Sequence, residues 1–129
     1  MNDELKYAIT KLEKALNKLK EGVAEAKDEL DKDGVIQRFE FTFELYWKAL
    51  KIFLRNSGVE AKTPKETLKE AFKIGWIIDE EKHLNMLEDR SNTLRIYDKE
   101  TSEATFKRIK EDYVVIIDAG LKKLSEKDD

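Results

Sequence analysis

The sequence contains no cysteine and only one histidine, His83, among its 129 residues. The first absence excludes disulfides, zinc–thiolate sites and thiol catalysis, and the second excludes a metal centre built from several histidines of one chain. No apolar run reaches the ~18 residues of a membrane span, and no signal peptide opens the chain. We therefore expect a soluble cytoplasmic protein that has no membrane partner, no metal and no other cofactor.

Glycine and proline are also scarce, with five and one residues, whereas 41% of the chain is charged. Few helix breakers among many charged residues favour helices. The formal net charge of -3 argues against a broad nucleic-acid-binding surface, although not against a local basic cleft. The length fits one domain over residues 1–129.

The spacing of apolar residues predicts two long helices in the first half of the chain. Steps of four and three predict a helix over residues 3–30 and then a turn at Asp31–Gly34. Residues 34–57 alternate like a strand, but a strand of this length would be abnormal, so we predict a helix that ends near Gly58. Its aromatic residues cover more than one face, so it is central or buries a second face in a partner. The apolar seam of the first helix is Leu5, Ile9, Leu12, Leu16, Leu19, Val23, Ala26 and Leu30.

Capping signals divide the second half of the chain. Thr63 and Pro64 predict the start of a short helix that ends near Gly75, and Asp79 predicts the start of another. A turn over 98–102 leads to a last helix over about 102–124, and 125–129 form a charged tail. The residues expected to face inward are Leu68, Ala71, Phe72, Leu84, Leu87, Leu94, Phe106, Ile109, Tyr113, Ile116, Ile117 and Leu121. We predict an all-α fold, an antiparallel up-and-down four-helix bundle with one additional short helix.

Two carboxylates are candidates for chemistry on the second helix. Glu40 and Glu44 lie one turn apart, near Gln37, and paired carboxylates can do acid–base work or bind a divalent metal. The alternative is a salt-bridged helix face with Arg38 or Lys48.

His83 and the aromatic residues also allow two interpretations each. His83 is either a general base or shared ligand, or a surface or partly packed side chain. Tyr46 and Trp47 either stack on a nucleotide base or pack in the core, and their helical spacing favours packing.

Residues 90–98, at a predicted helix end, include many polar and charged side chains. Arg90 and Arg95 are two of only five arginines, and Asn92 and Tyr97 lie between or beside them. Arginine binds phosphate through a planar, bidentate fork, whereas the rest of this chain uses mainly lysine. The stretch is either a phosphate-binding site or a helix-end salt-bridge cluster.

These motifs, with the run Gly34–Lys48, resemble the signature of the nucleotidyltransferase substrate-binding family, part of the HEPN superfamily of helical bundles. Thr63-Pro64, Glu70–Phe72 and Met86–Arg90 match the same family, and the resemblance extends over residues 4–122. It implies a homodimer and a separately encoded minimal nucleotidyltransferase as partner. It also implies a toxin–antitoxin pair in which many toxin members are metal-independent endoribonucleases with a cleft across the dimer.

The family motif is an arginine, four to six residues, a histidine and often a tyrosine two residues later. By resemblance, Arg90 is the motif arginine and Tyr97 the tyrosine that the nucleotidyltransferase adenylylates, but Arg95 stands at the histidine position and Ser91 replaces a usual Asn or Asp. Arginine stays protonated, so Arg95 can bind phosphate but cannot act as a general base.

Three functions follow from this departure. The leading one is a regulatory, substrate-binding subunit with weak or absent nuclease activity, in which Arg90, Asn92, Arg95, Tyr97, Gln37, Glu40 and Glu44 bind a nucleotide or RNA. The second is an active endoribonuclease that uses Arg90, Arg95 and Tyr97. The third is a purely structural helical adaptor, in which all of these side chains are dispensable.

Overall fold

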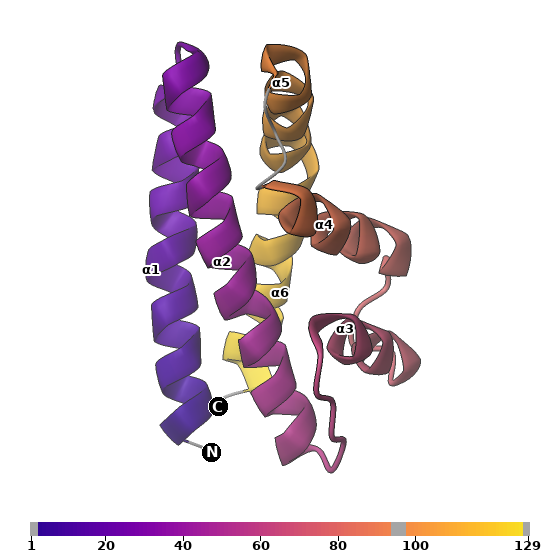
Figure 1. The fold of residues 1–129 in the computed structure, drawn as a ribbon. Coiled ribbons are helices and arrows are strands. Elements are labelled where there is room, and N and C mark those ends of the chain that lie inside the picture. Colours follow the sequence, from indigo (N-terminus) through magenta and orange to yellow (C-terminus); the bar gives the residue numbers. More distant parts are fainter. Residues whose placement is uncertain (1–2, 94–97, 128–129) are drawn as a thin grey trace.

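The computed structural model describes residues 3–93 and 98–127. These residues form helices and turns with no strand among them, which confirms the all-α class. The helices are α1 (Asp3–Glu25), α2 (Glu29–Asn56), α3 (Pro64–Lys73), α4 (Glu80–Asn92) and a C-terminal helix. The C-terminal helix consists of α5 (Lys99–Arg108), a π-helical turn (Ile109–Tyr113) and α6 (Val114–Lys127). Figure 1 shows α1, α2 and the C-terminal helix running lengthwise, with α3 and α4 to one side of α2 and α4 lying obliquely.

The turn between the first two helices lies earlier than the sequence predicts. The Asp28 side chain accepts a hydrogen bond from the Asp31 amide at 2.8 Å, and Asp31 accepts one from the Lys27 amide at 3.0 Å. These reciprocal caps end the first helix at Glu25 and place the predicted turn, Asp31–Gly34, inside α2. Leu30 is consequently 78% exposed instead of continuing the apolar seam.

The α2 helix is central, as its aromatic residues predict. It contacts α1, α3, α4, α5 and α6. Its buried aromatic side chains are Phe39, Phe43, Tyr46 and Trp47, so packing is the role that the structure gives them. The helix ends as predicted near Gly58, whose φ of 87° provides the left-handed residue, and the Val59 amide then donates to Leu54 O at 2.8 Å.

The capping residues predicted for the next two helices are confirmed. Thr63 Oγ1 accepts from the Glu66 amide at 3.1 Å, and Asp79 accepts from the Lys82 amide at 3.1 Å. Between these helices Gly75 takes a φ of 76°. The α3 helix buries Leu68 and Ala71, but Phe72 is exposed, because this short helix buries only the side that faces α2 and α4.

The C-terminal helix is longer than predicted and contains a π-helical turn that the sequence does not signal. It begins after Asp98, which caps the Thr101 amide at 2.7 Å, and continues to residue 127 instead of ending near 124. Within the turn the Val114 amide donates to Ile109 O, an i to i−5 bond that inserts one extra residue. Ile109, Tyr113, Ile117 and Leu121 are buried, while Phe106 and Ile116 are half-buried.

Two further findings bear on where the chain could bind a ligand or a membrane. No helix in the described part of the chain is long and apolar enough to cross a bilayer. Residues 3–93 and 98–127 also contain no group of three or more histidine, aspartate or glutamate side chains arranged to hold a metal ion.

Candidate functional site

Arg90 lies in the last full turn of α4 and reaches across to α2. Its Nη2 atom is 2.9 Å from Glu44 Oε2, and both side chains are half-exposed, at 39% and 30%. The other Glu44 oxygen is 3.9 Å from Lys48 Nζ, one turn further along α2. The salt-bridge interpretation of Glu44 with Lys48 is therefore confirmed, with Arg90 as an additional partner.

The second glutamate binds the same helix end. The Thr93 hydroxyl donates to the Glu40 carboxylate and also lies 2.8 Å from Arg90 O. Because Glu40 and Glu44 are one turn apart on α2, they contact successive parts of the C-terminal end of α4. We call these four residues, Arg90, Glu44, Glu40 and Thr93, the Arg90 cluster. It brings together three of the residues predicted from the sequence.

The remaining predicted site residues lie outside this cluster. Asn92 is exposed at the end of α4, and Gln37 is exposed on α2, where it borders a hollow of about 430 Å³ between α1 and α2. Arg95 and Tyr97 lie outside the described residues. The predicted phosphate site is therefore described only for its Arg90 half.

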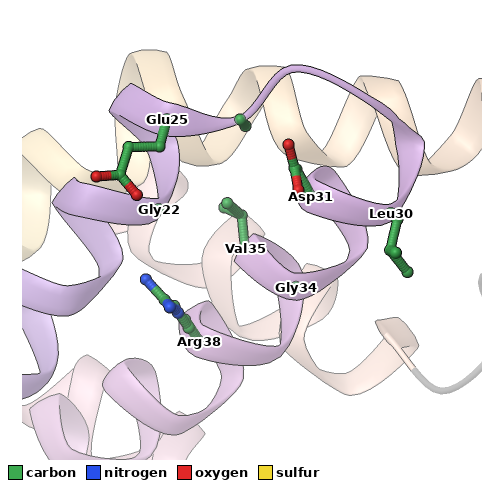
Figure 2. A pocket seen from close by; sticks show the side chains of 8 residues that line it. Gly22, Glu25, Leu30, Asp31, Gly34, Val35 and Arg38 are labelled. Atoms are coloured by element: carbon green, nitrogen blue, oxygen red, sulfur yellow. The ribbon is translucent and has the colours of Figure 1, made fainter.

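Arg38, the other partner predicted for the glutamates, binds elsewhere. Its Nη1 donates to Lys18 O on α1 at 2.7 Å. Figure 2 shows Arg38 extending from α2 toward Gly22 and Glu25 of α1, beside a second hollow of about 290 Å³. A Cβ on Gly22 would lie 3.0 Å from Arg38 Nη1, so this glycine provides the space that the arginine occupies.

A partly buried cluster next to Arg90 is not predicted from the sequence. Asp89 accepts from Arg108 Nε at 2.7 Å, from Arg108 Nη2 at 2.9 Å and from the Tyr113 hydroxyl. We call Asp89, Arg108 and Tyr113 the Asp89 cluster. Burial and the bond to Asp89 raise the pKa of Tyr113 well above its usual range, and the hydrogen bonds to Asp89 raise the pKa of Arg108. Tyr113 stays a neutral donor and Arg108 a cation, so the cluster holds α4 against the C-terminal helix.

His83 is buried, which makes the prediction of a surface or partly packed side chain wrong. Its Nδ1 atom is 2.8 Å from Asp79 O and its Nε2 atom is 2.8 Å from the Tyr46 hydroxyl. A carbonyl only accepts, so Nδ1 carries the proton, Nε2 accepts and Tyr46 donates. Burial lowers the pKa of His83 against the opposing effect of Asp79. The histidine is neutral and fully bonded, about two helical turns from Arg90, and is no free base for that site.

The Tyr46–His83 pair also depends on a close approach of α6. A Cβ on Gly120 would lie 2.6 Å from both the Tyr46 hydroxyl and its ring. Tyr46, His83 and Gly120 line a mainly apolar hollow of about 230 Å³, together with Trp76, Ile78 and Lys123 among other residues. Only glycine fits this contact without displacing the ring.

Comparisons with known proteins agree on one family. A family profile described as nucleotidyltransferase substrate binding protein like matches residues 3–126. A Haemophilus influenzae protein named probable ribonuclease HepT is 32% identical over 87 residues, which are 64% of this chain and 59% of that protein. The match thus spans about three-fifths of that relative's length. A crystal structure of a Thermus thermophilus protein superposes with a TM-score of 0.82 at 38% identity, over 88% of this chain and 98% of that one.

Proposed function

This chain belongs to the nucleotidyltransferase substrate-binding-protein-like family, and from that premise we propose that it is the substrate-binding, regulatory partner of a separate minimal nucleotidyltransferase. In this proposal the ligand is a nucleotide or an RNA, and Arg90 is the main residue that binds its phosphate. The observation that carries the proposal is the position of this arginine, half-exposed at the end of α4 and bound through a single nitrogen to Glu44. Such a guanidinium has donors left for a planar anion.

Residues that follow Arg90, together with Gln37 of α2, complete the proposed site. Arg95 supplies a second cation to the phosphate, and Asn92 and Gln37 supply amide groups. Tyr97 is the acceptor of AMP: its phenol oxygen attacks the α-phosphate of ATP in the partner enzyme, loses its proton and releases pyrophosphate. The role of Tyr97 comes from the family motif and that of Arg95 from the chemistry of arginine, and both residues lie outside the described part of the chain.

We infer that nuclease activity is weak or absent. Arg95 replaces the histidine that would move a proton, and arginine has no lone pair to accept one. The single histidine of the chain cannot substitute, since both nitrogens of His83 are bonded within the fold. The loss of general acid–base help costs about 10²–10⁴-fold in rate.

The second candidate function is a metal-independent endoribonuclease. The relative from Haemophilus influenzae, named a probable ribonuclease, favours it. In that case Arg90 and Arg95 stabilise the charge on the phosphorane while Tyr97 or water handles protons. The experiment below separates the two candidates.

We also propose a cytoplasmic homodimer of single-domain subunits with the family's antiparallel four-helix arrangement, in which α3 is the additional short helix. The α2 helix offers a surface for the second copy, because Leu30 and Phe41 are 78% and 63% exposed on it. Residues spaced by four and three positions lie on one face of a helix. This face of α2 contains Leu30, Gly34, Gln37, Phe41 and Glu44, so the Arg90 cluster lies beside the proposed dimer surface. Light scattering that gives a monomer mass at micromolar concentration would contradict the dimer.

The function is tested with a labelled single-stranded RNA and three proteins: wild type, Arg90→Ala and Arg55→Ala. Arg55 is a half-exposed arginine of α2 that pairs with Glu4, far along the helix from Arg90, and serves as the matched control. We expect Arg90→Ala to weaken RNA binding by about 10–100-fold, the value of one or two charge-assisted hydrogen bonds, and Arg55→Ala to change it little. Equal RNA binding by all three proteins would contradict a phosphate site at Arg90. It would favour the structural adaptor, in which this side chain is dispensable.

Two further readouts decide between the candidate functions. Co-expression with the proposed minimal nucleotidyltransferase, followed by intact-mass analysis, should add AMP to wild type and not to Tyr97→Phe. Metal-free RNA cleavage by wild type that Arg90→Ala abolishes would instead establish the nuclease. Cleavage that appears only in Arg95→His would identify a nuclease scaffold that lacks its proton carrier.

A further inference from the structure

The guanidinium of Arg90 is only partly open to a ligand. A guanidinium binds a phosphate bidentately through one of two edges, Nε with Nη2 or Nη1 with Nη2. The Nε atom of Arg90 is buried and has no hydrogen-bond partner among the described residues. Nη2, which belongs to both edges, is bonded to Glu44. One edge is therefore closed by burial, and the other includes the nitrogen that already binds a carboxylate.

We propose that Glu44 competes with the phosphate ligand for Arg90 and so sets the affinity of the site. This inference rests on the proposed function and assigns Glu44 a role opposite to a ligand-binding group. A phosphate that takes the open edge displaces the carboxylate from Nη2, because two anions on neighbouring hydrogens of one guanidinium repel each other. Binding is thus an exchange of one anion for another.

The neighbours of Glu44 make this exchange possible without unfolding the helix end. Glu44 contacts Arg90 through one oxygen, and its other oxygen already faces Lys48 at 3.9 Å. When Glu44 leaves Arg90, Lys48 remains as its partner. The Glu40–Thr93 hydrogen bond is separate and continues to hold the end of α4 on α2. The two glutamates therefore differ: Glu40 holds the helix, whereas Glu44 holds the arginine until an anion replaces it.

The competition predicts a gain of affinity when the Glu44 charge is removed. In Glu44→Gln a neutral amide replaces the competing carboxylate at nearly constant size. We expect single-stranded RNA to bind about two- to fivefold more tightly, the scale of a half-exposed ion pair. Glu40→Gln removes the same charge one turn away, but it loosens the helix end and should give no such gain.

The test measures the binding of one labelled single-stranded RNA by fluorescence anisotropy. The proteins are wild type, Glu44→Gln, Arg90→Ala, the double variant Glu44→Gln/Arg90→Ala, and Glu70→Gln. Glu70 pairs with Lys73 on α3, so Glu70→Gln reports the effect of one less negative charge elsewhere on the chain. We expect tighter binding by Glu44→Gln alone, and loss of that gain in the double variant. Thermal unfolding verifies that each variant is folded.

The outcomes separate this inference from the proposed function. If wild type binds RNA through Arg90 but Glu44→Gln binds equally or more weakly, the competition is wrong and the function stands. A gain that persists in the double variant, or that Glu70→Gln reproduces, is a general charge effect and also refutes the competition. If no protein binds RNA, the proposed function fails and the inference fails with it.

Discussion

Asp89 and Arg90 are neighbours in the sequence, yet α4 directs them into opposite environments. The Asp89 side chain is 17% exposed and accepts three hydrogen bonds from two residues of the C-terminal helix. The Arg90 side chain is 39% exposed, bonds to Glu44 through one nitrogen and leaves its Nε without a partner among the described residues. The Asp89 carboxylate is therefore largely enclosed and has three donors, although its partner Arg108 is 42% exposed, whereas the Arg90 guanidinium has one carboxylate partner.

The difference separates a structural group from a group that can bind a ligand. A buried carboxylate with all its partners costs free energy if any of them is removed. A half-exposed arginine with one carboxylate partner contributes little to folding and exchanges that partner easily. The Asp89 cluster, together with His83, fixes α4 so that Arg90 can remain adjustable.

Asp89→Ala should destabilise the fold most. It removes the acceptor of three hydrogen bonds and leaves Arg108 and the Tyr113 hydroxyl without their shared partner. We expect a loss of about 2–3 kcal/mol in the free energy of unfolding, below the value for a fully buried pair because Arg108 is partly exposed. Urea unfolding measures it. The control is Asp112→Ala, since Asp112 is half-exposed and 3.6 Å from Lys82; a loss of equal size there would remove the distinction between buried and exposed carboxylates.

The sequence predicts the helices well because their ends are decided locally. Thr63, Asp79 and Asp98 each cap the amide three residues later, and Gly58 and Gly75 take the positive φ that ends a helix. The error at Asp31–Gly34 has a local cause as well. The apolar spacing continues to Leu30, but the reciprocal caps of Asp28 and Asp31 override it and start α2 earlier.

The candidate site is less predictable because it depends on contacts between helices. Glu40, Glu44 and Arg90 were identified by residue type and motif, but their pairing requires the crossing of α2 by α4. Asp89 lies in a stretch that resembles the family, but nothing local indicates its partners, because they lie 19 and 24 residues away and Tyr113 belongs to the π-helical turn that follows Arg108. For His83 the sequence favours a surface or partly packed side chain, because its only obvious carboxylate partners are neighbours such as Glu80, whereas its partners in the structure are a backbone carbonyl and a tyrosine of α2.

The second prediction concerns the pH dependence of stability that the buried side chain of His83 causes. Burial lowers the pKa of His83 in the folded protein below its ordinary value of 6.5. The unfolded chain therefore binds the proton first, and the free energy of unfolding should fall as the pH falls from 7.5 to 5.5. Each unit by which the folded pKa is lowered corresponds to about 1.4 kcal/mol.

The measurement is the urea midpoint of wild type and His83→Gln at several pH values within this window. Carboxylates titrate mainly below it, so the slope above pH 5.5 reports the histidine. We expect His83→Gln to be less stable at pH 7.5 but to lose most of the pH dependence. An unchanged slope in this variant would assign the dependence to another group and weaken the description of His83 as a buried neutral base.

Arg90→Ala should have the smallest effect on stability. It removes one half-exposed ion pair, whose contribution is about 0–1 kcal/mol, and it also removes a buried Nε that has no partner among the described residues. These two changes oppose each other, so we expect the free energy of unfolding to change by less than about 1 kcal/mol, well below the effect of Asp89→Ala. The same variant should bind single-stranded RNA far more weakly than wild type. A loss of stability as large as that of Asp89→Ala would instead show that Arg90 is part of the structural framework, because a residue kept available for a phosphate contributes mainly to binding.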